Sequence, residues 1–197
     1  IGVGTGDDLT VIKKYGPVYG LDIDQRALDL IPDDFLVEKR QGDACALSYP
    51  DNFFDCVVAF DVLEHIQDDV QAIREIQRVL KSGGVFVATV PAVPFLFSKH
   101  DVVLHHFRRY RHKQFCTLLR NQFNTLTCGY WICFLFGFVV FQRLVLEKLR
   151  PSAQLHQPLP RVINAIFIKI LALENWLISK KIKLPIGTSL WAICKKS

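Results

Sequence analysis

Three glycines and one carboxylate near the start of the chain have the types and spacing of a cofactor-binding turn. Gly2, Gly4 and Gly6 alternate with other residues, and Asp22 ends the next apolar run. Glycines let a backbone adopt positive φ angles and approach a ligand closely. An acidic side chain at the end of the following strand can accept hydrogen bonds from both hydroxyls of a ribose. The pattern therefore predicts a site for a cofactor that contains adenosine.

The residue after the third glycine limits the kind of cofactor. Dinucleotide-binding loops have the pattern G-x-G-x-x-G, whereas Asp7 occupies the position of the last glycine here. A carboxylate there would repel a pyrophosphate, which normally binds at a helix N-terminus. We therefore expect a cofactor without phosphate groups.

The elements that position these residues alternate between strand and helix. Apolar runs predict strands at residues 17–22, 35–40, 54–60 and 85–90, with weaker signals at 126–133 and 187–195. Helical patterns lie between them, at residues 7–15, 24–30, 68–80 and 113–122. This alternation predicts an α/β fold with right-handed crossovers and helices on both faces of a mostly parallel sheet. Ligands bind at the carboxyl ends of such strands, where Asp22 is expected.

A series of motifs in this order resembles the class I S-adenosylmethionine-dependent methyltransferases. After the glycine loop and Asp22 come Gly42-Asp43-Ala44, Phe54-Asp55-Cys56-Val57-Val58, Leu63-Glu64-His65-Ile66 and Arg78-Val79-Leu80-Lys81-Ser82-Gly83-Gly84. The resemblance covers about residues 1–122 and is nearest to the small-molecule branch that includes quinone-biosynthesis enzymes. It implies a Rossmann-like fold with a seven-stranded sheet, whose last strand is antiparallel between the fifth and sixth. Because the family has an acidic residue just before the position of Ile1, we expect an N-terminally truncated chain.

The resemblance also implies S-adenosylmethionine as the cofactor and a role for each residue near it. Asp22 would bind the ribose hydroxyls, Ile23 would pack on adenine, and Asp43 would accept the adenine amino group. Ala44 would give a backbone contact, and the glycines and Phe60 would lie near the methionine part. The alternative is an ordinary turn for each glycine, and a cap or exposed loop for each aspartate. The cofactor-binding residues implied are Gly2, Gly4, Gly6, Asp22, Ile23, Asp43, Ala44 and Phe60.

A first polar cluster, Asp61, Glu64 and His65, follows the strand at 54–60. Its members would share a face if the segment forms one helical turn. Similar patterns hold a divalent cation in quinone O-methyltransferases, and carboxylate oxygens suit magnesium. The pattern is also widespread in metal-free relatives, so we predict no metal and take His65 as a candidate general base.

A second polar cluster follows the strand at 85–90 and contains His106, Arg109 and Tyr110. These side chains could grip an anionic group of the acceptor and supply a base. The alternative is a loop that packs Tyr110 and pairs its arginines with carboxylates. The predicted catalytic set is His65, His106, Arg109 and Tyr110, with His100 and His105 as weaker candidates.

Composition indicates one domain, residues 1–197, with a cofactor-binding core at 1–122. Half of the 197 residues are hydrophobic, and the net charge is +5. The basic excess lies at residues 108–113 and 180–196, where a solvated face or an anion contact is favoured over nucleic-acid binding. The six cysteines form no C-x-x-C pair or zinc spacing. They are typical of buried thiols in a reducing compartment, so we expect a cytoplasmic protein.

An apolar helical insertion is expected at residues 133–186, before the last strand. Residues 125–141 carry no charge, and helical patterns lie at 143–149 and 162–179. The uncharged stretch fits a core strand and a buried helix, a helix docked at a membrane interface, or a spanning helix. Basic residues at 143, 148 and 150 would suit anionic headgroups in the docked arrangement. The later helix has one apolar stripe, formed by Ile163, Ile166, Ile170, Leu173, Trp176 and Leu177.

These features predict methyl transfer from S-adenosylmethionine to an oxygen or carbon of a small, hydrophobic or lipid-linked acceptor, with peripheral membrane contact. One alternative is a protein or RNA methyltransferase. Many amino-directed enzymes have N/D-P-P-Y/F after the fourth strand, and this chain has Phe60-Asp61-Val62-Leu63 there, which argues against that alternative. Another is a non-catalytic module that docks on a membrane or a partner, which the intact glycine loop disfavours. The acceptor and the oligomeric state do not follow from the sequence.

Overall fold

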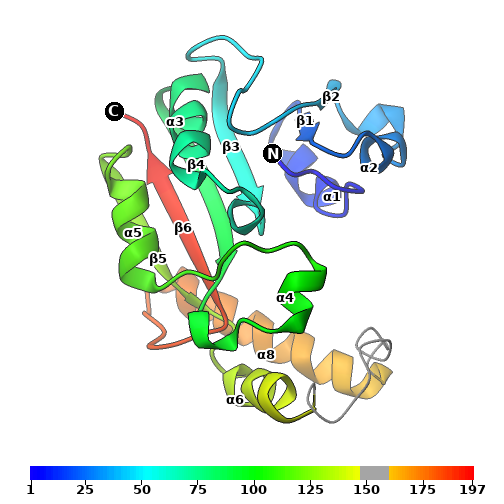
Figure 1. Ribbon diagram of the computed structural model, residues 1–197, viewed down its shortest axis with the longest axis vertical. Helices are drawn as coiled ribbons and strands as arrows, with labels where there is room; N and C mark the ends of the chain where they lie inside the picture. Colours follow the sequence, from blue (N-terminus) through cyan, green and yellow to red (C-terminus); the bar gives the residue numbers. More distant parts are fainter. Residues whose placement is uncertain (147–159) are drawn as a thin grey trace.

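The computed structural model describes residues 1–146 and 160–197, which form an α/β fold with two β-sheets (Figure 1). The first sheet has two parallel strands, and the second has four strands in the order β3-β4-β6-β5. The strands are β1 (Tyr19–Asp22), β2 (Glu38–Gln41), β3 (Phe54–Phe60), β4 (Leu80–Pro91), β5 (Thr125–Trp131) and β6 (Ser189–Lys195).

The helices lie between the strands, as the sequence predicts. Asp24 caps α2 by accepting a hydrogen bond from Arg26 N–H, and Asp68 caps α3 by accepting one from Gln71 N–H. Short 3₁₀ turns complete several connections, including η3 (Leu63–His65) after β3. The α-helices are α1 (Leu9–Ile12), α2 (Gln25–Asp29), α3 (Asp69–Val79), α4 (Lys99–Val103), α5 (His112–Arg120), α6 (Phe136–Phe141) and α8 (Arg161–Ser179).

The sheet differs in one respect from the seven-stranded sheet expected. β3 and β4 are parallel, and β6 runs antiparallel between β4 and β5, as predicted for the last strand. The described residues, however, form six strands in two sheets, so the seven-strand count is not confirmed. Backbone bonds at the start of the chain lie between the sheets: Gly2 N–H donates to Leu21 O at 2.7 Å, and Ile1 N donates to Val58 O at 2.9 Å.

The main core lies between α3, α5 and the four-stranded sheet. Ile73, Ile76 and Val79 of α3 are fully buried, as are Phe115 and Leu119 of α5. This spacing gives each helix one apolar face toward the strands. A smaller cluster of Leu9, Leu28, Ile31 and Leu36 packs the N-terminal part. Leu21 of β1 and Ala59 of β3 both belong to the main cluster, so the carboxyl ends of these strands share one core.

In the part of the β5–β6 segment that the structure describes, the helices are mostly not buried. Residues 125–131 form the strand β5, and α6 has no buried residue. A buried helix and a single span through residues 125–141 are therefore both wrong. The helix expected at 143–149 is a π-helix over Gln142–Leu146; its remainder and the basic positions 148 and 150 lie outside the described residues.

Helix α8 lies beside α6 and leaves most of its apolar surface exposed (Figure 1). The rings of Phe138 on α6 and Phe167 on α8 are in contact, with their centroids 5.1 Å apart. Among the described helices, α8 is long and apolar enough to cross a membrane by length and composition, and only 6% of its apolar window is buried. A core helix that passes the same test is mostly buried. Four of the six residues of the predicted stripe are exposed, namely Ile163, Ile166, Leu173 and Trp176.

The cysteines also differ from expectation. Cys116 on α5 and Cys128 on β5 form a disulfide. Of the free cysteines, Cys194 is buried and Cys56 is exposed. The prediction of mostly buried free thiols is therefore wrong, because it considered neighbours in the sequence and not the contact between α5 and β5.

Candidate active site

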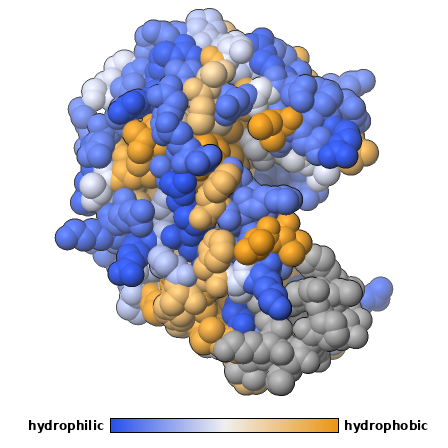
Figure 2. Space-filling view, viewed as in Figure 1, coloured by the Kyte–Doolittle hydropathy of each residue, from blue (hydrophilic) through white to orange (hydrophobic). Residues whose placement is uncertain are grey.

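A cavity of about 580 Å³ lies at the carboxyl ends of β1 and β3, next to η3. Its wall comes from the start of the chain, the end of β1, the turn after β2 and the segment after β3. In Figure 2 the surface is indented between α4 and the part of the chain that carries β1 and β2. The volume is within the range that ligand pockets have.

Most of the predicted cofactor residues meet in this cavity. Those that line it are Gly2, Asp22, Ile23, Asp43 and Ala44. The other three, Gly4, Gly6 and Phe60, are not in its wall. Sequence reasoning missed Cys45, Ile66, Gln67 and Asp68, which line the far side; their proximity to the Gly42 and Leu63 motifs was the available signal.

Asp22 fixes the conformation of the glycine loop. Its Oδ2 accepts a hydrogen bond from Gly4 N–H at 2.8 Å, and its Oδ1 accepts one from Asp24 N–H at 3.0 Å. Each carboxylate oxygen can accept a second hydrogen bond. Asp22 can thus hold the loop and also bind a ligand with hydroxyl groups.

Gly2 brings the backbone to the cavity wall. Its φ is +65°, a region that residues with a side chain rarely adopt, and an added Cβ would collide with Val62 Cγ2. Val62 lines the same cavity. Glycine at position 2 therefore keeps this end of the cavity open.

Ile23 and Asp43 lie at the rim. The Ile23 side chain is 73% exposed, an uncovered apolar surface beside the cavity. Asp43 Oδ1 accepts a hydrogen bond from Cys45 N–H at 2.8 Å, which orders the turn after β2. An apolar surface next to an acidic turn suits a planar base with an exocyclic amino group.

His65 is the predicted catalytic residue that reaches the cavity. Burial, and next the charge of His106, lower the pKa of His65 from its ordinary 6.5. At neutral pH its imidazole is therefore neutral and able to accept a proton. The ring of His106 packs edge-on against it, with centroids 4.5 Å apart.

Behind the two histidines, Asp101 is fully buried and holds His106 and Arg109. The Asp101 Oδ1 lies 3.0 Å from His106 Nδ1 and accepts a hydrogen bond from Arg109 Nε at 2.8 Å. It also forms an ion pair with Arg109 Nη2 at 2.7 Å. Burial raises the pKa of Asp101, but the hydrogen bonds from Arg109 and Ser98 N–H outweigh it and leave the pKa below its ordinary value. As a carboxylate, Asp101 keeps the proton of His106 on Nδ1.

The predicted catalytic residues Tyr110 and Arg109 lie outside the wall of the cavity. The Tyr110 hydroxyl is buried and donates to Asp69 Oδ2 at 2.7 Å, and burial raises its pKa well above the ordinary value. Arg109 is buried, forms an ion pair with Asp101, and donates a hydrogen bond from Nη1 to Ala92 O at 3.3 Å. Neither lines the cavity, because both anchor the loop after β4. These contacts fit the alternative of a packed tyrosine and a paired arginine, and a catalytic role for either residue stays a prediction.

Glu64 is a further polar residue of the site, and sequence reasoning considered it only as a metal ligand. It is fully buried, and neither carboxylate oxygen has a hydrogen-bond partner in the described part of the chain. Burial, with the charge of Asp61 nearby, raises the pKa of Glu64 to about 8. Ligand atoms of Glu64, His65 and His106 all lie within 4.8 Å of one another and could hold a metal ion. The absence of a metal stays a prediction.

Comparison with known proteins gives the same class as the motifs. The family model of a methyltransferase domain matches residues 1–88. A demethylmenaquinone methyltransferase of Lactobacillus johnsonii is 38% identical over 92 residues, which is 41% of this chain and 38% of that protein. The ubiquinone/menaquinone biosynthesis C-methyltransferase UbiE of Hahella chejuensis is 42% identical over 69 residues, or 34% of this chain and 28% of its own length. The match thus spans less than half of these relatives.

A solved structure extends the likeness to the whole fold. Phosphoethanolamine N-methyltransferase 2 of Haemonchus contortus, in complex with S-adenosyl-L-methionine, has a TM-score of 0.64 at 16% identity, over 99% of this chain and 47% of that one. At this identity the likeness shows the fold alone. The domain match over residues 1–88 supports the predicted class, a class I S-adenosylmethionine-dependent methyltransferase, and the fold agrees with it.

Proposed function

We propose that the cavity binds S-adenosylmethionine and that the protein transfers its methyl group to a small, hydrophobic acceptor. The observation that carries the proposal is Asp22, which lines the cavity while its carboxylate holds the glycine loop. Ile23 beside it supplies an apolar surface for the base. When bound, the cofactor supplies an electrophilic methyl group on a sulfonium, so the protein has to align the acceptor, exclude water and remove a proton.

His65 is the residue that we propose as the general base. It lines the cavity, and because its pKa is lowered, its ring is neutral at pH 7 and can accept a proton. His106, fixed by Asp101, limits the rotation of the His65 ring from behind. An imidazole nitrogen of His65 would accept the proton of an acceptor hydroxyl or activated carbon.

A lipid-like acceptor is supported by apolar side chains near the indentation. Figure 2 shows an apolar patch at α4, below the indentation. Val102 and Val103 of α4 are exposed, as are Phe138 and Phe141 of α6. The quinone-biosynthesis relatives are named for substrates of this chemical kind. We therefore propose a quinone-like or similar lipid-linked acceptor that reaches the cavity from this side.

Peripheral membrane contact through α8 belongs to the same proposal. The solvent-facing side of α8 combines Val162, Ile166 and Trp176 with the basic Lys169. Lysine side chains can bury their stems in an interface and keep their charge in the headgroups. A helix with this composition can lie in the plane of an anionic membrane.

The cofactor site is tested by replacing Asp22. Because Asp22 both orders the loop and faces the ligand, Asp22→Ala should weaken binding of S-adenosylmethionine more than tenfold in an equilibrium titration. Asp34→Ala, an exposed acid outside the cavity, is the matched control and should bind like the wild type. Equal affinity of the Asp22→Ala variant and the wild type would refute the site assignment.

A further inference from the structure

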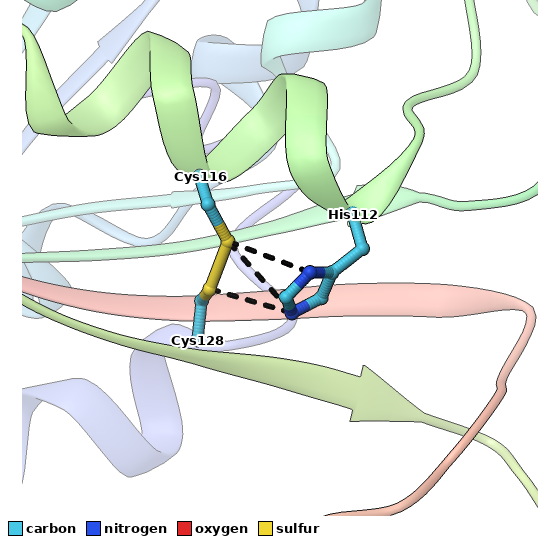
Figure 3. Close-up of a disulfide and its surroundings, with 3 residues drawn as sticks. All are labelled: His112, Cys116 and Cys128. Atoms are coloured by element: carbon cyan, nitrogen blue, oxygen red, sulfur yellow. Dashed lines mark hydrogen bonds between the residues drawn. A yellow bond between two sulfur atoms is a disulfide. The ribbon is translucent and has the colours of Figure 1, made fainter.

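A second cluster of reactive side chains lies between α5 and β5 and does not line the cavity. It consists of His112, Cys116 and Cys128, whose ligand atoms all lie within 4.8 Å of one another. Figure 3 shows the imidazole directed at both sulfurs of the disulfide. The methyl-transfer proposal uses none of these residues.

The backbone places the three side chains together. His112 and Cys116 are four residues apart on α5 and so share one face of the helix. Cys128 lies on β5, which α5 covers. His112 Nε2 is 3.5 Å from Cys128 Sγ and 3.7 Å from Cys116 Sγ. The ring of Tyr130 stacks on His112 with centroids 5.3 Å apart, which holds the imidazole in this orientation.

We propose that His112, Cys116 and Cys128 form a redox-gated binding site for a thiophilic divalent cation such as zinc. Two cysteine thiolates and one imidazole are the ligands that zinc prefers. In the disulfide form the two sulfurs are bonded to each other and cannot act as thiolates, so the site is closed. In the dithiol form it is open.

The opening step is an ordinary thiol–disulfide exchange. A dithiol reductant, small-molecule or protein, attacks one sulfur, and the Cys116–Cys128 bond breaks while the reductant forms its own disulfide. Two electrons and two protons thus pass to the cysteines. When the cation binds, both thiols release their protons to solvent and coordinate as thiolates.

The observed distances suit this change. In a tetrahedral site with metal–sulfur bonds of about 2.3 Å and a metal–nitrogen bond of about 2.1 Å, the nitrogen lies about 3.6 Å from each sulfur. His112 Nε2 already has that separation from both sulfurs. The reduced sulfurs would need to move apart to about 3.8 Å, which side-chain rotation allows. His112 and Cys128 are partly exposed, so water can supply the fourth ligand.

Cobalt(II), a spectroscopic substitute for zinc, tests the proposal on the full chain. The protein is reduced with a phosphine in metal-free buffer and titrated with Co²⁺, and the thiolate-to-cobalt charge-transfer absorption is followed. We expect one equivalent bound per reduced chain, none by the disulfide form, and displacement by Zn²⁺. The double variant Cys116→Ser/Cys128→Ser should lose the absorption, and the exposed-thiol control Cys56→Ser should keep it.

The His112→Ala variant separates a metal site from a simple disulfide. It keeps both thiols, yet its affinity for Co²⁺ should fall at least tenfold, with a changed ligand-field spectrum. Circular dichroism of each variant confirms that it is folded. If the reduced wild type binds no more Co²⁺ than the double serine variant, or if His112→Ala binds as tightly as the wild type, the proposal is wrong.

Discussion

At the scale of single residues, Asp101 is the group that holds the loop after β4 in place. It is fully buried and forms an ion pair with Arg109, whose side chain is only 5% exposed. Asp101→Asn should destabilise the protein by about 3–5 kcal/mol, because the buried Arg109 charge loses its partner. Denaturant unfolding measures the change.

A surface pair provides the control for that variant. Asp55 forms an ion pair with Lys81, and the two side chains are 86% and 46% exposed. Asp55→Asn should cost less than about 1 kcal/mol, as exposed pairs do. Similar losses for the two variants would contradict the assigned role of Asp101.

Glu64 gives the site a pH dependence with a definite sign. Its pKa is about 8 in the folded chain and about 4.5 unfolded, so between these values the folded state holds a proton that the unfolded state releases. The contribution of Glu64 to stability is therefore fully present below pH 4.5 and is lost as the pH rises toward 8. Glu64→Gln, which cannot ionise, should remove this loss, amounting to about 1.4 kcal/mol for each pH unit in the window.

The measurement is the free energy of unfolding of Glu64→Gln and the wild type from pH 4.5 to 8. The difference should grow with pH in favour of the variant, and the exposed-acid control Asp34→Asn should show no such trend. A difference that is constant with pH would contradict the buried, protonated state of Glu64.

At the scale of elements, α8 is the test of membrane contact. Ile166 and Trp176 are exposed, so replacing both with Gln removes apolar surface from the helix without opening a cavity in the core. We expect the double variant to cosediment severalfold less with anionic phospholipid vesicles, at unchanged unfolding free energy. Ala165→Gln on the same helix is the control. Wild-type sedimentation no greater than that of a water-soluble protein would end the membrane proposal.

The elements also show where sequence patterns are informative. Asp24 and Asp68 mark the starts of α2 and α3, because capping depends on residues next to one another in the chain. The apolar stripe of α8 predicts the helix correctly, and four of its six residues are exposed. A periodic pattern gives the spacing of apolar residues, but not which of them meet a partner.

At the scale of the whole molecule, the class and most of the residues that line the cavity could be predicted, and the contacts between distant segments could not. Asp22 and His65 lie at the cavity as expected, since Asp22 ends β1 and His65 belongs to the short turn after β3. Arg109 and Tyr110 follow a strand too, but Asp101 and Asp69 turn them into the interior. The Cys116–Cys128 disulfide depends on α5 packing on β5, a tertiary contact with no local signal.

The central claim is that the cavity binds S-adenosylmethionine, and calorimetric titration tests it most directly. S-Adenosylmethionine and S-adenosylhomocysteine are titrated into the protein beside NAD. The account predicts micromolar binding of the first two and none of NAD, because Asp7 disfavours a pyrophosphate at the glycine loop. Absence of binding by a folded protein, or preference for NAD, would contradict it.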